Sequence, residues 1–516
     1  MTWTRRDFIR HASALTAAGL GVGCTEEEPA TGPGSGPWGA PADATQSALL
    51  LPSERAPEGV LELFLWGGVN AFDTFHVIPE HGDPSAGGDF AGQGWWAFQE
   101  GPDSIPEVFQ RCGGGGRPLL EPWRRDGDGR QVHLGPFLYP LRERPDLLAR
   151  TRSLVMRHDA APHQVAVPLA LGGHINSNPR LAGFGAHVER FHQARSGARD
   201  SPYAWVLFPD RIDITAHNAY AAVAVGAHEG SARPTGLLMG QGSRLVDLLG
   251  RSNLGERSAE VDAALAWYLG SYGGALAGPD GNPVRAPALA GYEAAIGGLA
   301  RSERLRGLLP AELLSVPTAE SCGEQSDLDL STAQLRLGAH LLTRAVEPAK
   351  YVCMVDGGML PTSTGAAYDT HRNHVVESSR NLVHVFSQLV GLINEPGEDD
   401  PDKLDLDRHQ ILITTEFGRS PHIQNGSGLN HWPQGYVQWV IGGWADEERS
   451  GIIGTIAESG HATNSISPSE FRAALLLGQG IWPFNGEAFA VGDTRVDGSE
   501  ADAARWLREH VLGYPT

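Results

Sequence analysis

The feature that most constrains the fold of this chain is the recurrence of short apolar runs between longer helical patterns. The runs have strand length and lie at residues 60–66, 153–158, 203–208, 351–356, 411–417 and 437–443. Several are apolar throughout, which is typical of strands covered on both faces. The helical patterns lie at residues 258–270, 289–301, 331–346, 375–394 and 468–477. This alternation predicts an α/β fold with a central, mostly parallel sheet flanked by helices.

Composition divides the 516 residues into a leader, a tether and a large folded part. Residues 25–47 are acidic and rich in Gly and Pro, so they cannot bury enough apolar area to fold and are interpreted as a disordered tether. Residues 48–516 are expected to fold, either as one large α/β domain or as two to four smaller units. The Ala- and Leu-rich stretch from about 215 to 330 is interpreted as a helical insertion.

Residues 1–24 have the pattern of an export signal. Arg5 and Arg6 precede the small-residue apolar stretch "HASALTAAGLGVG", which is too short to span a bilayer as a permanent helix. This pattern is typical of the twin-arginine route and predicts a protein of the periplasm or cell envelope. Cys24 follows "GLGVG" as in a lipoprotein cleavage box, although Gly21 stands where Leu is usual. Lipid attachment at Cys24 and simple cleavage nearby are both open. Membrane association is expected only through the signal or a lipid anchor.

The charge balance and the cysteines narrow the class of partner. The formal net charge is -21, which argues against nucleic acid because phosphate binding needs clustered Lys and Arg. The acidity is compatible with bound cations. The four cysteines show no metal-type pairing, so their pairing is not predicted: Cys24, Cys112, Cys322 and Cys353.

Acidic and histidine side chains follow the ends of the predicted strands. In open α/β sheets, ligands bind beyond the carboxyl ends of the strands, so these side chains are candidates for one site. In chain order they are Asp73, His163, Asp369, His371, His374, Glu416, Arg419 and His431. Carboxylate with imidazole favours zinc, manganese or a similar divalent ion, whereas carboxylate alone suits calcium or magnesium better.

Most of the candidates also have a structural interpretation. His431, beside Trp432-Pro433, could belong to a packed surface turn. In "DTHRNH", residues 369–374, Asp369 or Asn373 could cap the helix that follows and leave the histidines solvated. Asp73 could form an Asx turn after Gly67-Gly68. A carboxylate at the end of an apolar strand needs a cation or hydrogen-bond partners, so Glu416 could be a metal ligand or the ion-pair partner of Arg419.

The sequence lacks several motifs that mark other kinds of catalytic or cofactor-binding site. A Gly-x-Ser-x-Gly elbow is absent, which argues against a serine α/β-hydrolase. No Gly-x-Gly-x-x-Gly follows the first predicted strand, and neither a P-loop nor a His-Glu-x-x-His motif occurs.

Four blocks, in this order, resemble the DUF1501 family of exported bacterial proteins. They follow the twin-arginine start and read "LFLWGGVNAFDTFHVIPE", "RHDAAPHQVAVPLALGG", "AYDTHRNH" and "ILITTEFGRSPHIQNGSGLNHWPQG". The resemblance covers roughly residues 58 to 485, and the "EFGR" and "HWP" pieces are its most specific part. The family is similar in turn to the alkaline phosphatase and sulfatase superfamily, which implies an alkaline phosphatase-like sheet, metal ions at strand ends and hydrolysis of phosphate or sulfate esters.

The resemblance also implies roles for single residues. It assigns metal binding to Asp73, to Asp369 with His374 or less well His371, to Glu416 and to His431. Two positions depart from the superfamily: Phe417 replaces a metal-binding His, and His163 occupies the place of the Ser, Thr or Cys nucleophile.

The chemistry implied by these substitutions differs from that of the superfamily. Attack falls to a water activated by a divalent ion or to His163, while Arg419 pairs with the anionic substrate, a small-molecule or glycan ester. The alternative is a non-catalytic envelope protein that retains a metal or ligand-binding site.

Overall fold

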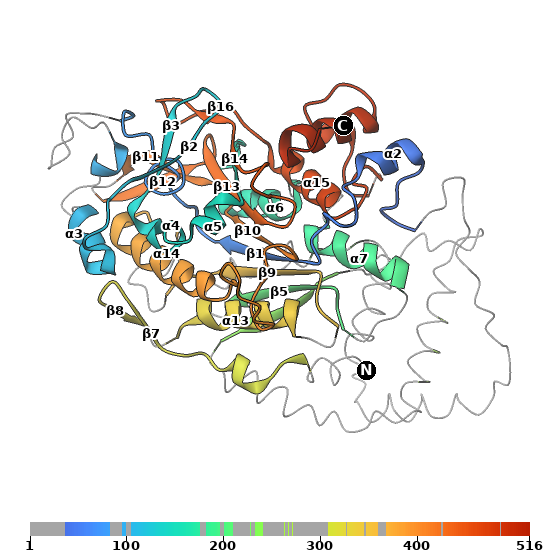
Figure 1. Cartoon of the computed structure of the whole chain (residues 1–516), viewed down its shortest axis with the longest axis horizontal. Coiled ribbons are helices and arrows are strands. Elements are labelled where there is room, and N and C mark those ends of the chain that lie inside the picture. The colour runs from blue at the N-terminus through green and yellow to red at the C-terminus, as the bar shows by residue number, and fades with distance from the viewer. Residues whose placement is uncertain are drawn as a thin grey trace, which may run out of the picture. The chain divides into compact units, whose positions relative to one another are not determined.

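A large mixed sheet forms the centre of the protein in the computed structural model, shown in Figure 1. Except for residues 263, 267 and 271, the described residues lie in one compact unit made of residues 36–228, 232–246 and 303–516. The structure describes residues 37–82, 95–99, 105–175, 182–196, 201–209, 226, 228, 233–240, 263, 267, 271, 308–326, 328–344, 347–359, 368–424, 427–485 and 487–515.

The central sheet has the strand order β14-β4-β13-β10-β1-β9-β5-β6 among the described residues. In chain order the strands are β1 (Gly59–Leu65), β4 (Thr151–Met156), β5 (Ala204–Pro209), β6 (Thr235–Met239), β9 (Tyr351–Asp356), β10 (His409–Thr414), β13 (Tyr436–Gly442) and β14 (Gly451–Ile453). In this sheet all strands but β13 run in the same direction. The prediction of a mostly parallel sheet is therefore confirmed.

Helices cover both faces of this sheet (Figure 1). Leu61 and Glu62 are consecutive in β1, so their side chains point to opposite faces. Leu61 lies against Gly338 of α13, whereas Glu62 binds Arg472 of α15. The helices are α2 (Ala44–Leu49), α3 (Ile105–Phe109), α4 (Tyr139–Arg142), α5 (Pro145–Ala149), α6 (His163–Gly172), α7 (Phe184–Ser196), α13 (Leu330–Thr343), α14 (His374–Gly391), α15 (Pro468–Gly478) and α16 (Glu500–Trp506).

Four small two-stranded sheets accompany the central one in the described part of the chain. They pair β2 (Glu121–Arg125) with β3 (Gln131–Leu134), β7 (Ala319–Ser321) with β8 (Glu324–Ser326), β11 (Gly418–Gln424) with β12 (Gly428–Trp432), and β15 (Thr455–Ile456) with β16 (Ala462–Asn464). The β11–β12 hairpin matters most for the site, because it continues the chain beyond the carboxyl end of β10.

A fully buried ion pair fixes α15 to the middle of β1. The guanidinium of Arg472 donates to both carboxylate oxygens of Glu62 at 2.6 and 2.8 Å, and its Nε donates to the carbonyl of Ala170 in α6. Tyr351 and Thr414 also donate to Glu62. Burial opposes the charge, but Arg472 outweighs it and holds the pKa of Glu62 below its ordinary value. With its partners satisfied, the pair joins α6 and α15 to three strands.

The N-terminal boundary of the fold lies earlier than the sequence predicts. The signal at residues 1–24, including Cys24, lies outside the described residues. The predicted tether, 25–47, is wrong for residues 37–47, because Trp38 donates to Glu487 at 2.9 Å and Asp43 caps α2. Composition alone missed these anchoring contacts. No helix in the described ranges combines the length and apolar character needed to cross a membrane.

The predicted helical insertion at 215–330 contains strands where the structure describes it. β6 joins the edge of the central sheet beside β5, and the β7–β8 hairpin lies near the end of the region. Apart from residues 263 and 267, the helices predicted at 258–270 and 289–301 lie outside the described residues. The helical insertion therefore stays a prediction for the residues outside the described ranges, whereas the short run Thr235–Met239 is a strand that pairs with the buried strand β5.

One disulfide, which the sequence did not predict, joins two distant parts of the chain. Cys112 bonds to Cys322 across a sequence separation of 210 residues and ties the segment after α3 to the turn between β7 and β8. Cys353 is buried within β9 and is not in a disulfide.

Candidate metal centre

The carboxyl ends of parallel strands bring most of the predicted site residues together. His163 is the first residue of α6, the helix that follows β4, and Glu416 comes two residues after the end of β10. Arg419 and His431 lie opposite each other in the β11–β12 hairpin. Asp369 follows β9 in the chain and lies against Gly67, at the end of β1.

Gly67 makes this close approach feasible. Its φ is +113°, a conformation that favours glycine, and a Cβ there would lie 2.2 Å from the backbone nitrogen of Asp369. Its own N–H donates to Glu416 at 2.8 Å. Gly67 thus lets the segments that carry Asp369 and Glu416 approach the end of β1 closely.

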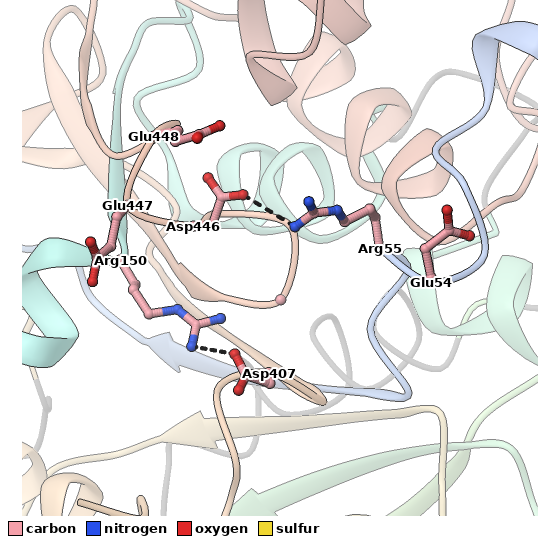
Figure 2. Close-up of a pocket in the computed structure, with 8 residues that line it drawn as sticks. Glu54, Arg55, Arg150, Asp407, Asp446, Glu447 and Glu448 are labelled. Carbon is pink, nitrogen blue, oxygen red and sulfur yellow. Dashed lines mark hydrogen bonds and ion pairs between the residues drawn. The ribbon is translucent and has the colours of Figure 1, made fainter. Parts of the chain in front are cut away.

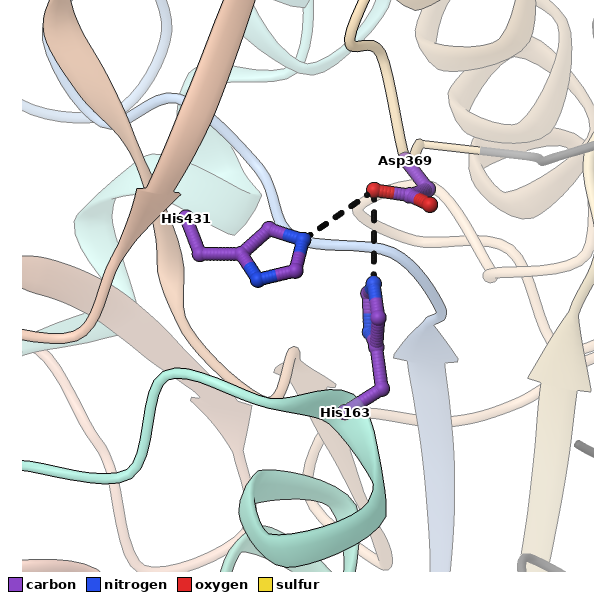
Figure 3. A group of neighbouring side chains, drawn as sticks. All are labelled: His163, Asp369 and His431. Carbon is purple, nitrogen blue, oxygen red and sulfur yellow. Dashed lines mark hydrogen bonds and ion pairs between the residues drawn. The ribbon is translucent and has the colours of Figure 1, made fainter.

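His163, Asp369 and His431 form a compact cluster, in which both rings point at one carboxylate (Figure 3). Oδ1 of Asp369 lies 3.3 Å from Nε2 of His163 and 3.4 Å from Nε2 of His431. The donor atoms of the three residues all lie within 4.8 Å of one another. His371 adjoins the cluster, with its Nε2 3.1 Å from the same oxygen and 3.0 Å from Nε2 of His431.

Glu416 lies behind the cluster and is fully buried. Its Oε1 lies 2.8 Å from Nδ1 of His163 and accepts the Gly67 bond, while the hydroxyl of Thr415 lies 3.3 Å from Oε2. The structure therefore places Glu416 next to the ring of His163 and not among the three converging donors.

Arg419 is fully buried and contacts the same oxygen of Asp369 as the histidines do. Its guanidinium donates to Asp369 and to the backbone carbonyls of Gly67, Gly68 and Leu429. Its ion-pair partner is thus Asp369, whereas the structural alternative drawn from the sequence named Glu416.

The cluster shifts the pKa values of its members. Burial disfavours the charged ring of His163, but the carboxylates of Asp369 and Glu416 outweigh it and raise its pKa to about 9. Burial likewise opposes the charge of Asp369, yet the surrounding histidines and Arg419 hold the pKa of that carboxyl well below its usual range. Burial lowers the pKa of His431. Asp369 is thus a permanent anion facing imidazole nitrogens.

Asp73 and His374 form a separate buried pair. Nε2 of His374 lies 2.9 Å from Oδ2 of Asp73, and its Nδ1 contacts the hydroxyl of Thr370, the residue after Asp369. Oδ1 of Asp73 is buried without a hydrogen-bond partner among the described residues. Asn373 stands at the N-cap of α14, but its side chain makes no capping bond. The structure links this pair to the cluster through Thr370.

The spacing of the cluster fits a divalent ion. Metal–ligand bonds of roughly 2.0–2.2 Å place neighbouring ligand atoms of a tetrahedral site about 3.3 Å apart. The Nε2 atoms of His163, His371 and His431 lie 3.1 to 3.4 Å from Oδ1 of Asp369, and those of His371 and His431 lie 3.0 Å apart. The donor atoms of His163, Asp369 and His431 all lie within 4.8 Å of one another. Nε2 of His163 is buried and has no hydrogen-bond partner among the described residues. One carboxylate with two or three imidazoles suits zinc or manganese.

Comparison with known proteins points to one family. The pattern of a family described as protein of unknown function (DUF1501) matches residues 337–485. This match supports the DUF1501 family. Searches of curated proteins and of solved structures gave no match. The DUF1501 segment contains Asp369, Glu416, Arg419 and His431, whereas Asp73 and His163 precede it.

Several contacts around the DUF1501 segment were not singled out from the sequence. Trp66 stacks on the ring of His163 at 5.4 Å, and the carbonyl of Ala161 lies 2.7 Å from Nδ1 of His431. Nε2 of His158 lies 2.7 Å from the carbonyl of Glu416. These contacts involve backbone carbonyls or side chains from segments far apart in the chain, so no local sequence pattern indicates them.

A pocket of about 470 Å³ lies elsewhere, near the amino ends of β4 and β10 (Figure 2). Arg150 and Asp407, one and two residues before these strands, form an ion pair of 2.6 Å. Arg55 and Asp446 form another, of 3.4 Å. The remaining lining residues are Glu54, Gly443, Glu447 and Glu448. The pocket contains none of the predicted site residues, and its arginines are already paired with acids.

Proposed function

We propose that this protein is an exported, metal-dependent hydrolase of phosphate or sulfate esters, of the DUF1501 type. His163, Asp369 and His431 would hold a divalent ion, zinc or manganese, with His371 at its edge. The observation that carries the proposal is the convergence of their donor atoms, within 4.8 Å of one another, where parallel strands end.

The chemistry follows from the residues around the ion. A divalent ion held there would supply Lewis acidity towards an ester oxygen and water. Arg419 holds the carboxylate of Asp369 in place. Position 163 carries an imidazole and no hydroxyl or thiol, and its ring would serve as a ligand, so we assign water as the nucleophile. The positive charges of a divalent ion and Arg419 together exceed the negative charges of Asp369 and Glu416. This net positive charge favours an anionic substrate.

Export is supported by two independent features. The leader has the twin-arginine pattern, and the Cys112–Cys322 disulfide is of a kind that persists in oxidising compartments. The proposed location is therefore the periplasm or cell envelope, with a lipid at Cys24 as the proposed anchor.

A second function is metal or ligand binding without catalysis. The burial and the hydrogen bonds of Arg419 favour it. Four contacts to protein oxygens engage its buried guanidinium, so it is not available to bind a substrate anion as the sequence predicted. Of the residues expected to act on substrate, none then offers an exposed cation.

Metal analysis of the purified protein, combined with a screen of aryl phosphate and sulfate esters, separates these functions. The hydrolase should retain one equivalent of metal and lose turnover in Asp369→Asn and His431→Ala. The matched control is Asp329→Asn, which changes a buried carboxylate 2.9 Å from His384. Metal without turnover would support the binding protein, and no metal under any loading condition would exclude both the hydrolase and a metal-binding protein.

A further inference from the structure

Glu416 occupies the place where the superfamily carries a metal ligand, but its surroundings give it another task. We infer that Glu416 is a positioning residue, which fixes the nitrogen that His163 presents to the metal centre; the inference rests on the proposed function. The carboxylate of Glu416 would then contact a metal ligand and not the metal. The direct ligands would be His163, Asp369 and His431, with or without His371.

The hydrogen bonds around Glu416 carry this assignment. The carboxylate is fully buried, and its Oε1 lies 2.8 Å both from the N–H of Gly67 and from Nδ1 of His163. Because a carboxylate can only accept, Nδ1 of His163 must carry a proton. The lone pair of a neutral His163 ring then resides on Nε2, the atom 3.3 Å from Asp369.

His431 shows the same arrangement with a backbone acceptor. Its Nδ1 lies 2.7 Å from the carbonyl of Ala161, which also can only accept. Both rings therefore direct Nε2 to the same oxygen of Asp369. Histidine ligands of metals usually donate their second N–H to a carboxylate or carbonyl, and this contact sets the tautomer and the ring orientation.

Phe417 completes the support and explains why an apolar residue replaces the histidine expected from the superfamily. Its ring lies 4.9 Å from that of His163 and stacks on that of His431 at 4.5 Å. Trp66 also stacks on the ring of His163 at 5.4 Å, so that imidazole contacts the rings of Trp66 and Phe417, and the imidazole of His431 contacts the ring of Phe417. Phe417 thus orients ligands that it cannot supply itself.

Zinc affinity of the full-length protein tests the role of Glu416. Glu416→Leu removes the acceptor and should weaken zinc binding by about 10- to 100-fold. Glu416→Gln keeps an oxygen for both N–H groups and should stay within about threefold of wild type, which a purely electrostatic role would not allow. The matched controls, Asp329→Asn and Asp329→Leu, alter a buried carboxylate–histidine contact outside the cluster, with His384, and should leave the affinity unchanged.

A His163→Asn background shows whether Glu416 acts through His163. There, Glu416→Leu should add less than a threefold loss of zinc affinity, because the ring that it orients is gone. The same 10-fold or larger loss in both backgrounds would overturn the inference. If Glu416→Leu does not fold, Glu416→Gln decides, since a loss of 10-fold or more with the acceptor oxygen retained would also overturn it.

A readout without metal separates this inference from the proposed function. The Nδ1–H proton of His163, bonded to a buried carboxylate, should give a slowly exchanging downfield NMR signal in the zinc-free protein. The signal should persist in Glu416→Gln and disappear in His163→Asn. If wild-type protein shows the signal but binds no zinc, the proposed function fails and the contact stands; if the signal is absent, the inference fails whatever binds.

Discussion

Arg419 and His431 lie opposite each other across the β11–β12 hairpin, and both reach the carboxylate of Asp369. The hairpin thus delivers a permanent cation and an imidazole to one anion contributed by a different part of the chain. Arg419 is fully buried, and its guanidinium donates to Oδ1 of Asp369, the same oxygen that Nε2 of His431 approaches.

Replacing Arg419 should destabilise the protein strongly. Arg419→Met leaves Asp369 and three backbone carbonyls without their buried donor, and we expect a loss of about 3–5 kcal/mol in unfolding free energy. Urea unfolding of metal-free protein measures it. Arg408→Met is the control, because its ion pair with Glu58 is exposed and should contribute at most about 1 kcal/mol. Equal effects of the two variants would contradict the structural role of Arg419.

The buried pair between Glu62 and Arg472 should behave in a way that distinguishes it from surface pairs. Arg472→Met alone should cost about 3–5 kcal/mol, since it leaves a carboxylate in the centre of β1. The double variant Glu62→Leu with Arg472→Met should recover most of this loss, because no uncompensated charge remains. Thermal or urea unfolding of the set gives the coupling, and additive losses would contradict the prediction.

His76 should make stability depend on pH. It is buried, neither ring nitrogen has a hydrogen-bond partner among the described residues, and burial lowers its pKa from 6.5 to about 4. As pH falls below 6.5, the unfolded chain gains a proton that the folded protein does not take up until about pH 4. Stability should therefore decline through this window, by up to roughly 3 kcal/mol, and fall no further from this group below it.

The difference between wild type and His76→Leu isolates that contribution. Both proteins contain the other titrating groups, so the gap between their unfolding free energies should change by the stated amount between pH 6.5 and pH 4. Parallel curves across this window would show that His76 is protonated equally in the folded and unfolded states.

Removing the disulfide should cost about 2–5 kcal/mol, because the bond closes a loop of 210 residues in the unfolded chain. The double variant Cys112→Ser with Cys322→Ser should unfold at lower denaturant than oxidised wild type. Reducing agent should lower the stability of wild type to that of the variant and leave the variant unchanged. An effect of reductant on the double variant would show that another contact is responsible.

The sequence was sufficient to predict the strands and helices that a local pattern determines. The apolar runs became strands β1, β4, β5, β9, β10 and β13, and the pattern at 468–477 became α15 with Ser467 and Glu470 in a capping box. The reversed direction of β13 was not predictable, because a strand buried on both faces has the same apolar pattern in either direction. Glu62, a charge inside an apolar run, was the overlooked sign of the ion pair with Arg472.

The site was predictable in its residue types and not in their roles. The sequence indicated that acids and histidines gather at strand ends, and the structure brings His163, Asp369, Glu416 and His431 together there. Which of them face one another depends on the close approach of Gly67 to Asp369 and on backbone acceptors such as Ala161. These are tertiary contacts between segments hundreds of residues apart, and a single sequence does not encode them in any local pattern.

Anomalous diffraction from crystals of the zinc-loaded protein, collected above and below the zinc edge, tests the central claim most directly. The proposal predicts one strong anomalous peak from a zinc ion bonded to Nε2 of His163, Nε2 of His431 and the carboxylate of Asp369. Glu416 should be hydrogen-bonded to His163 and not bonded to the ion. An empty cluster at saturating zinc, or a peak confined to the Asp73–His374 pair, would contradict it.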